Sequence, residues 1–425
     1  MSFRQLIIRH IFWRGLYFLS VFGVNVLLSR EFRADGSGWI YYVVNNLSFL
    51  LLLVSLCLEA GTAYYVSDGE MPAASAAGFC LIWSLVGAGL GAAFIGWMIP
   101  AAPRAFGSRL ELNLACIIYV FGVLLSTYFA ALFFARKHFV TPNAILLGVN
   151  LVLIAWLALE RNSPMLRAHI VLFYFSFFLL QGIILLSVFL LQAGSVKFPS
   201  TSLIGKLFRY SLLALVGNAI FFLVCRVDYW FVRGFCSLSD LGNYIQASKL
   251  AQAFLLVPSI TASTLFPLVA GGQREEVNQG LQVLTRGMLG LIGLFLILLG
   301  LAGWWAFPAI FGKTFSEMPL LFILFIPGIL ALTAHYPLTA YYSGKKRLEV
   351  NIRGSLLGLG VIVTGDWFGI PRFGVWAAPV VSSLGYACYC GYVLTVFTRE
   401  YRVRALDFFL PRLLDLAWLK KKLSA

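Results

Sequence analysis

The sequence predicts an all-α polytopic membrane protein with about twelve transmembrane helices in two six-helix bundles. Of the 425 residues, 60% are hydrophobic and 12% are charged, whereas a soluble globular protein carries about 25% charged residues. The apolar runs, such as residues 170–191, are continuous over the ~20 residues that a membrane-spanning helix needs. A transmembrane barrel would instead show weaker segments of alternating polarity, so we expect the spans to be helices.

About twelve apolar runs divide the chain into spans with short connections. We predict these spans at residues 7–29, 39–66, 75–100, 111–135, 143–159, 168–192, 207–232, 243–270, 283–308, 318–342, 354–371 and 374–398. The longest internal connection, 193–206, contains Gly, Ser and Pro and lies near the middle of the chain. It separates an N-terminal bundle (1–195) from a C-terminal bundle (196–400), which a basic cytoplasmic tail (401–425) follows.

The distribution of Lys and Arg predicts the orientation of the chain. The formal net charge is +15, which in a soluble protein would suggest a nucleic-acid partner. In a membrane protein the same residues collect in short cytoplasmic loops. With the N-terminus in the cytoplasm, 21 Lys and Arg residues fall on the cytoplasmic side and 9 on the outer side. We therefore expect both termini in the cytoplasm and no nucleic-acid partner.

No sequence pattern predicts catalysis or a cofactor. The chain lacks the H-E-x-x-H, G-x-S-x-G and P-loop motifs, and no connection is long enough to hold a substrate in water. The seven cysteines lie mostly within apolar runs, and Cys388 and Cys390 point away from each other on a helix. We expect no enzyme activity, no metal site, no disulfide and no cofactor.

The two halves of the chain read as repeats of each other. The exit from the first span and the exit from the seventh each show a polar hinge with Asp and Gly, followed by an aromatic residue that opens the next helix. At an offset of 204, Gly38 falls on Gly242 and Asn45 falls on Lys249. Six spans per half is an even number, so the halves are predicted to be parallel repeats about an axis along the membrane normal.

Ionisable residues within the spans mark a candidate site. Arg226 and Asp228 lie in the seventh span and Lys249 lies in the eighth. A charged side chain at bilayer depth costs at least ~2.5–3.5 kcal/mol and usually faces a partner or water. Helical spacing places Arg226 and Asp228 on nearly opposite faces, so that one is expected to face a central space and the other a neighbouring helix. Asp228 and Lys249 are candidates for a structural ion pair, and Lys249 is equally a candidate for substrate binding.

Other polar residues complete the candidate set. In the first span Arg14 and Asn25 share one helical stripe, although Arg14 can instead reach the cytoplasmic interface. Glu59 and Asp366 are expected at the membrane interfaces. The candidates for binding a diphosphate or a sugar are Arg226, Lys249, Arg14, Asn25, Gln246 and Asn218.

Several passages resemble a known family. In residues 226–260 an Asp within a helix precedes a short loop ending in Gly-x-Tyr and then Ala-x-Lys-Leu, here Asp228, Gly242, Tyr244, Ala247, Lys249 and Leu250. Residues 370–386 (IPRFGVWAAPVVSSLGY) and the basic loop in 338–354 fit the same pattern, and 29–42 fits more loosely. The passages are similar to those of the polysaccharide flippases in the multidrug/oligosaccharidyl-lipid/polysaccharide (MOP) exporter superfamily.

The resemblance implies a MATE-like fold and a Wzx-type flippase of the bacterial inner (cytoplasmic) membrane. Two bundles would surround a central cavity. The cargo would be an undecaprenyl-diphosphate-linked oligosaccharide that moves from the cytoplasmic to the periplasmic leaflet for O-antigen, capsule or exopolysaccharide assembly. Partners would be this lipid-linked oligosaccharide, the bilayer, and a polysaccharide polymerase with chain-length proteins. One departure is that Val24 stands at the position equivalent to Asp228, so charge is concentrated in the second half.

Three alternatives remain open at this point. A lipid II flippase of the same superfamily would usually have more than twelve helices and more basic helices in its first half. A multidrug exporter would carry acidic residues deep in its cavity, and acids are few here. A membrane enzyme of polysaccharide assembly would need a large periplasmic loop, which the sequence lacks.

Overall fold

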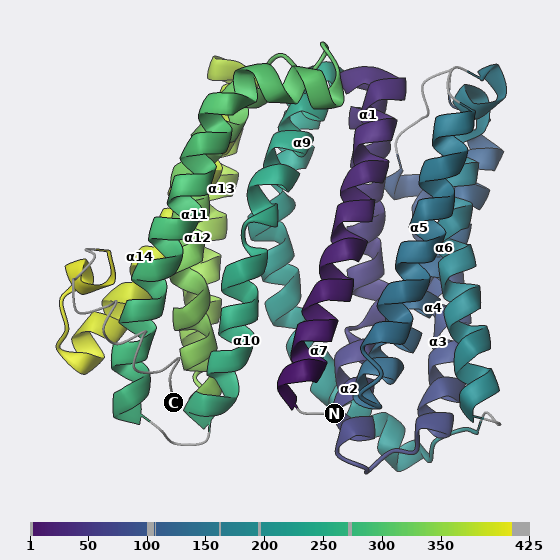
Figure 1. Ribbon diagram of the computed structural model, residues 1–425, viewed down its shortest axis with the longest axis horizontal. Coiled ribbons are helices and arrows are strands. Elements are labelled where there is room, and N and C mark those ends of the chain that lie inside the picture. Colours follow the sequence, from purple (N-terminus) through teal and green to yellow (C-terminus); the bar gives the residue numbers. More distant parts are fainter. Residues whose placement is uncertain are drawn as a thin grey trace. The chain divides into compact units, whose positions relative to one another are not determined.

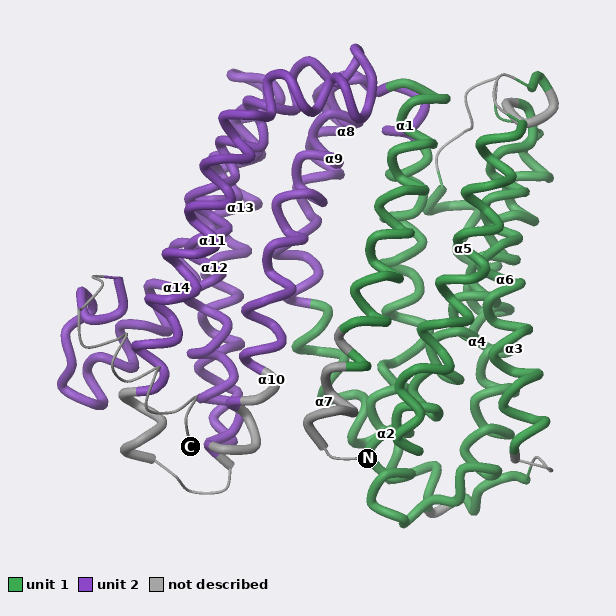
Figure 2. Tube along the Cα trace, in the orientation of Figure 1, with its two compact units in different colours: residues 1–33, 40–219 green, residues 34–39, 220–425 purple. Residues whose placement is uncertain are grey.

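A computed structural model describes residues 3–99, 106, 108–160, 163–193, 197–270 and 274–409. The predicted tail from 410 onward lies outside the described residues. Throughout the described part the regular structure is helical (Figure 1), which confirms the predicted fold class. The chain divides into two compact units (Figure 2), of which unit 1 holds residues 1–33 and 40–219 and unit 2 holds residues 34–39 and 220–425.

The helices of unit 1 follow the predicted order closely. They are α1 (Phe3–Ser55), α2 (Leu58–Ser67), α3 (Ala73–Met98), α4 (Arg109–Ala135), α5 (Val140–Leu159), α6 (Pro164–Ala193) and the first part of α7 (Thr201–Arg226). α4 packs along α6, where a Cβ on Gly122 would lie only 2.4 Å from the backbone nitrogen of Leu179. The missing side chain therefore lets these two backbones touch.

The helices of unit 2 come from the rest of the chain. They are the end of α7, α8 (Asp228–Phe235), α9 (Leu238–Ala253), α10 (Leu256–Ala270), α11 (Arg274–Phe311), α12 (Met318–Gly344), α13 (Leu348–Phe373), α14 (Ala377–Tyr401) and the short η3 (Ala405–Phe408). α12 packs against α9, α10, α11 and α14. α12 is therefore the central helix of unit 2.

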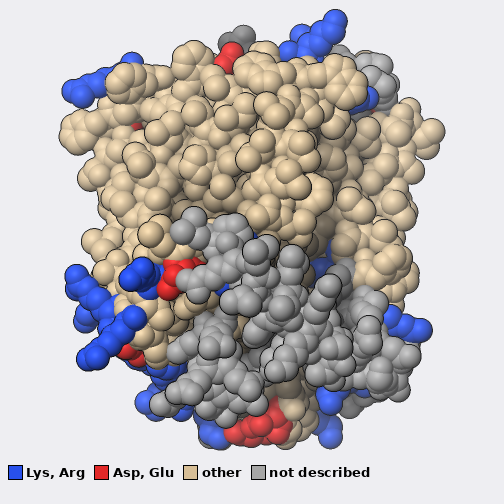
Figure 3. Space-filling view, turned by 60° about the vertical axis from the view of Figure 1, so that its left-hand side comes forward, with Lys and Arg blue, Asp and Glu red and all other residues tan. Residues whose placement is uncertain are grey.

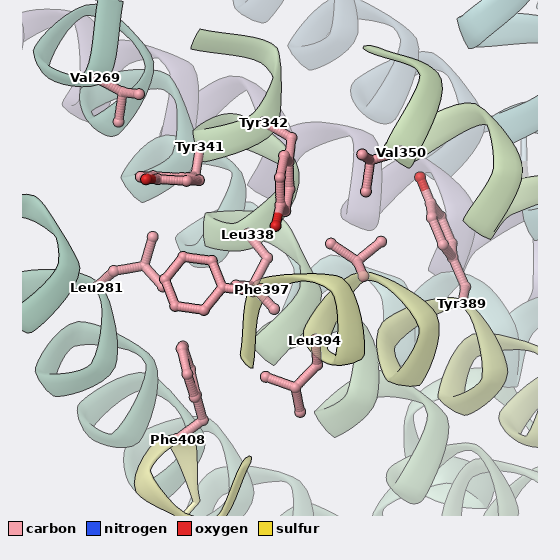
Figure 4. Close-up of a cluster of buried hydrophobic side chains, with 11 residues drawn as sticks. Val269, Leu281, Leu338, Tyr341, Tyr342, Val350, Tyr389, Leu394, Phe397 and Phe408 are labelled. Atoms are coloured by element: carbon pink, nitrogen blue, oxygen red, sulfur yellow. The ribbon is translucent and has the colours of Figure 1, made fainter. Parts of the chain in front are cut away.

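Unit 2 also has a buried apolar cluster, drawn in Figure 4. Its side chains come from α10 to α14 and from η3: Val269, Leu281, Leu338, Tyr341, Tyr342, Val350, Tyr389, Val393, Leu394, Phe397 and Phe408. The Phe408 ring meets Phe397 edge-on at 5.4 Å, and the Arg286 guanidinium donates to the carbonyl of Asp407. These contacts fix the chain just after α14 against the bundle.

The division differs from the predicted boundary at 195/196 because α7 contributes to both units. In its first part, Ser211 and Leu207 pack directly against Gly61 of α2. The Tyr210 ring stacks on Tyr64 with the two centroids 5.1 Å apart. These contacts hold the chain up to residue 219 in unit 1, so the unit boundary falls inside a helix and not in the polar connection.

Nine stretches of the described residues are long and apolar enough to cross a membrane. Two of them, Phe12–Ser55 and Leu348–Tyr401, contain 44 and 54 residues, and each holds two predicted spans divided by a backbone break. The breaks lie at Arg33, with φ 56°, and at Gly374, with φ 67°. With α9 and α10 as a further span, the helices match the twelve predicted runs. Figure 3 shows a broad uncharged band on the visible face, with Lys and Arg gathered toward its two ends.

The second span of each half is interrupted. In unit 1, Leu56 and Cys57 have φ values of 50° and 53° between α1 and α2. In unit 2 the interruption lies between Ala253 and Leu256. In unit 1 the tyrosine hydroxyl of Tyr128 donates to the freed carbonyl of Ser55 at 3.1 Å, so buried donors satisfy the break. Broken helices at matching places in two repeats are typical of transporters.

Residues 34–39 pack into unit 2 although their neighbours in sequence belong to unit 1. A Cβ on Gly38 would lie 2.7 Å from the backbone nitrogen of Gly242, and a Cβ on Gly242 would lie 1.9 Å from the carbonyl oxygen of Ala34. The backbone N–H of Ala34 donates to Thr314 Oγ1 at 3.1 Å. The two glycines that the repeat pairs at an offset of 204 therefore contact each other directly.

Candidate functional site

The interior of unit 2 contains a buried carboxylate with two hydroxyl partners. Asp228, the first residue of α8, has no exposed surface. Its Oδ2 accepts hydrogen bonds from the hydroxyl of Tyr244 on α9 and from Ser382 Oγ on α14, the latter at 2.9 Å. Its Oδ1 has no hydrogen-bond partner. One face of this carboxylate is therefore fixed while the other keeps an unfilled acceptor.

These hydroxyl contacts are made by the carboxylate that the sequence predicts to pair with Lys249. Tyr244 and Ser248 lie one turn apart on the face of α9 that meets α8, and Ser248 Oγ accepts from the Tyr229 hydroxyl at 3.1 Å. At about 100° per residue, Lys249 points about 140° away from Tyr244 around the helix. Its Cα–Cβ bond therefore leaves α9 on another face than that of Tyr244, and the ion pair with Asp228 stays a prediction.

A second buried carboxylate lies near the first. Asp366 on α13 has no exposed surface, and neither of its carboxylate oxygens has a hydrogen-bond partner. Its negative charge is near enough to Asp228 for the two to repel each other. The hydroxyl of Tyr386 on α14 is also buried without a hydrogen-bond partner. Asp366, which the sequence predicts at a membrane interface, is turned by its helix into the interior of unit 2.

Two carboxylates this deeply buried cannot both carry an uncompensated charge. A shared proton would relieve the repulsion, and so would a monovalent cation held by carboxylate and hydroxyl oxygens. Among the described residues no group of three or more His, Cys, Asp or Glu side chains could hold a metal ion.

One cation, Arg226, lies beside Asp228, and a second, Lys249, lies near Arg226. Arg226 at the end of α7 is half-buried, with its guanidinium carbon 5.3 Å from the centroid of the Tyr229 ring. Its charge attracts Asp228 and repels Lys249, which is also half-buried. Gln246, one turn before Lys249 on α9, is 3% exposed. The structure thus brings together the predicted candidates Arg226, Lys249 and Gln246 within unit 2.

The other three candidates belong to unit 1. The half-buried Arg14 has its guanidinium carbon 5.2 Å from the centroid of the Phe18 ring. The backbone carbonyl of Asn25 accepts from the Tyr41 hydroxyl at 3.0 Å. The Asn218 amide donates to Cys57 Sγ at 3.3 Å, beside the break between α1 and α2. None of these three takes part in the contacts of the acidic pair.

In unit 1, the spans that correspond to those carrying the acids of unit 2 are joined by a network of neutral hydrogen bonds. The Asn150 amide donates to Ser20 Oγ at 3.0 Å, and the Gln181 amide donates to Asn150 Oδ1 at 2.9 Å. These residues lie on the first, fifth and sixth spans of unit 1, as Asp228, Asp366 and Ser382 do in unit 2. Because the amides and the hydroxyl satisfy one another, this network holds helices together without carrying charge.

Sequence reasoning missed Asp366, Tyr244 and Ser382 as members of the site. Asp366 is an isolated acid in an apolar span, so the burial cost that marked Arg226 applies to it equally. Tyr244 and Ser382 lie inside the two passages that carry the family resemblance, where they read as packing residues. The packing of α8, α9 and α14 shows that Tyr244 and Ser382 donate hydrogen bonds to the same carboxylate.

Comparisons with known proteins place the fold. No family model matches the chain, and none of the curated proteins matches it. Among solved structures, the lipid II flippase MurJ in an inward closed conformation has a TM-score of 0.66 at 14% identity, covering 95% of this chain and 89% of MurJ. The Vibrio cholerae MATE transporter VcmN in its bent form has a TM-score of 0.63 at 12% identity, with 95% and 98% covered.

A third structure, an inward-facing multidrug resistance MATE transporter of the MOP superfamily, has a TM-score of 0.68 at 12% identity, covering 91% of this chain and 94% of that one. These neighbours are a lipid II flippase and two MATE transporters. The chain accordingly has the helical fold that these transporters share, and nine of its described stretches are long and apolar enough to cross a membrane.

Proposed function

We propose that the protein is a flippase for an undecaprenyl-diphosphate-linked oligosaccharide, which it moves from the cytoplasmic to the periplasmic leaflet for assembly of a surface polysaccharide. The observation that carries the proposal is the pair of half-buried cations Arg226 and Lys249, whose charges repel each other. Two like charges held together in an apolar setting attract a multiply charged anion.

A diphosphate is the anion that suits this pair. It carries several charged oxygens, and charge-assisted hydrogen bonds from Arg and Lys to phosphate are among the strongest in proteins. The guanidinium of Arg226 can hold two phosphate oxygens at once, whereas the ammonium of Lys249 acts as a point charge. The buried amide of Gln246, one turn away on α9, adds a polar group of the kind that recognises sugar hydroxyls.

The test of this function is export by Arg226 variants. We expect Arg226→Ala to reach the membrane at normal abundance but to reduce surface polysaccharide at least about tenfold, while lipid-linked oligosaccharide accumulates on the cytoplasmic leaflet. Arg226→Lys should restore part of the export, because the charge returns without the two-pronged geometry.

Arg209→Ala is the matched control, because Arg209 lies on the same helix with an exposed side chain. The control should export normally. Full export by Arg226→Ala would remove Arg226 from cargo binding and with it the main support for a diphosphate cargo.

A second candidate function is a cation-coupled exporter of another cargo. The acidic pair Asp228 and Asp366 favours it, because buried acids that exchange a proton or a cation are the expected coupling groups of such a transporter. Surface polysaccharide that is unchanged both by Arg226→Ala and by neutralising either acid would support this candidate over the flippase.

We further propose that both termini face the cytoplasm of a bacterial inner membrane, which places the α8–α9 connection outside. Cys236 in this connection tests the orientation. Burial, with a smaller contribution from the nearby Asp240 charge, raises the pKa of the Cys236 thiol to about 11. With Cys236 as the single cysteine, an impermeant maleimide added outside intact cells should label it slowly at pH 7.5, and the rate should rise about tenfold per pH unit toward pH 9 because the thiolate reacts.

The matched control for this labelling is Gly234→Cys in a cysteine-free chain, since Gly234 is exposed and a Cβ there meets nothing within 4 Å. An exposed thiol has a pKa near ~8.5, so it should react roughly a hundredfold faster at pH 7.5. Labelling of both positions only after the membrane is permeabilised would reverse the proposed orientation.

A further inference from the structure

An apolar groove of about 400 Å³ opens on unit 1 between α1 and α3. Its lining includes four aromatic rings and two leucines: Phe49, Leu53, Trp83, Leu90, Phe94 and Trp97. The volume falls within the range of pockets that hold small ligands. Leu53, Leu90 and Trp97 are 41%, 50% and 86% exposed, and in a membrane protein such surfaces face lipid. The groove is therefore open to the hydrocarbon of the bilayer.

The lining of the groove follows α3, and we call this groove the track. From Trp83 to Trp97 it follows fourteen residues of helix, which at 1.5 Å per residue is about 21 Å. This is roughly two-thirds of the ~30 Å thickness of the hydrocarbon core. Its inner end lies beside the break after α1, where the Trp83 indole N–H donates to the carbonyl of Val54 at 2.9 Å.

A cation stands at the outer end of the groove. The exposed Arg109 donates from its two terminal nitrogens to the carbonyls of Ile99 and Gly96, at 3.0 Å and 2.8 Å. These carbonyls flank Trp97 and Met98, which line the groove. The guanidinium is thus held beside the end of an apolar track, where the phosphate of a lipid would lie if its chain filled the track.

We propose that this groove binds the single hydrocarbon chain of a polyprenyl phosphate lipid, with Arg109 beside its phosphate. One track and one cation match a lipid with one chain and one anionic head, whereas a glycerophospholipid would leave its second chain outside. The inference rests on the proposed function and orientation, in which this end of α3 lies in the outer leaflet. The groove then holds the cargo lipid's chain on the side to which the head group is delivered.

Photo-crosslinking tests the groove without requiring transport. The full-length protein, with benzoylphenylalanine in place of Leu90, is reconstituted in phosphatidylcholine liposomes that contain radiolabelled undecaprenyl phosphate. Leu298 on α11 is the matched control position, because it is 52% exposed. We expect crosslinking at position 90 to exceed that at 298 at least fivefold, and unlabelled undecaprenyl phosphate, but not phosphatidylglycerol, to suppress it.

Further variants test separately how the groove binds the lipid's hydrocarbon chain and how it binds the lipid's phosphate. Leu53→Trp narrows the track and should reduce crosslinking at position 90 at least about threefold without touching Arg109. Arg109→Gln should reduce it about fivefold by removing the charge, and Arg109→Lys should recover part of the loss. Thermal melting of each variant confirms that the fold persists.

Equal crosslinking at positions 90 and 298 would overturn the inference. Suppression by phosphatidylglycerol as strong as that by undecaprenyl phosphate would also overturn it, because the groove would then be an ordinary lipid contact. Neither result would change the outcome of the Arg226 export test, which measures cargo transport in cells. Conversely, normal export by Arg226→Ala would contradict the proposed cargo, and the crosslinking result would still decide whether the groove binds a polyprenyl phosphate.

Discussion

Replacing Gly242 by alanine is expected to remove most of the folded protein from the membrane. A Cβ at this position would lie 1.9 Å from the carbonyl oxygen of Ala34 and 2.7 Å from its carbonyl carbon. Both are backbone atoms, so no flexible side chain can move aside. Overpacking of this kind costs about 1–3 kcal/mol and more where the backbone must shift, out of a native stability of about 5–15 kcal/mol.

Membrane abundance and thermal melting in detergent measure this effect. Gly234→Ala is the matched control, because a Cβ there meets nothing within 4 Å. We expect the control to retain the melting temperature of the unaltered protein. Normal abundance of Gly242→Ala would show that residues 34–39 can separate from α9 at little cost, and that the glycine contact is not needed for folding.

The second large effect is expected at Asp228. Asp228→Ala removes the acceptor of two buried hydroxyls, Tyr244 and Ser382. The Tyr244 hydroxyl and Ser382 Oγ lie 3.5 Å apart and can still bond each other, so about one hydroxyl proton loses its acceptor and the loss of stability should be about 1–3 kcal/mol. Asp228→Ala combined with Tyr244→Phe should recover part of that loss, because it removes one of the two hydroxyls along with the acceptor. Detergent melting curves of the single and double variants measure both effects.

Asp228→Asn separates folding from transport. The amide oxygen can still accept from both hydroxyls, so we expect near-normal melting, whereas the charge needed to bind a proton or a cation is gone. Export should fall at least about tenfold in Asp228→Asn and in Asp366→Asn, but not in the exposed control Asp68→Asn. Stable variants with full export would show that the acidic pair has no role in the transport cycle.

The fold could be predicted largely from the sequence because each span is long and continuously apolar. A run such as 170–191 has no alternative in hydrocarbon to a helix that satisfies its own backbone. The breaks within the helices were harder to predict from the sequence. Gly374 lies in a recognisable motif, but Leu56 and Cys57 are ordinary residues in an apolar run, and their conformation depends on partners such as Tyr128 that lie far away in sequence.

The sequence indicated which ionisable residues belong to the candidate site, but not which side chains they contact. Burial cost selected Arg226, Asp228 and Lys249 as candidates, and the three lie in unit 2. The pairing of Asp228 with Lys249 stays a prediction, whereas the hydrogen bond from Tyr244 to the same carboxylate could not be predicted from the sequence, because it depends on the rotation of α9. Ser382 lies 154 residues from Asp228, and such a contact follows only from the packing of α14 against α8.

The packing of residues 34–39 into unit 2 also has a consequence for biosynthesis. Ala34 hydrogen-bonds to Thr314, 280 residues further along the chain. At a synthesis rate of about 5–20 residues per second, the first hairpin would wait about 14–56 seconds after it emerges before this partner exists. The glycine surface at Gly38 is uncovered in the membrane until Gly242, 204 residues further along the chain, has been made. The two halves therefore complete their folding together and late, and a chain shortened before α9 would leave its first hairpin unfinished.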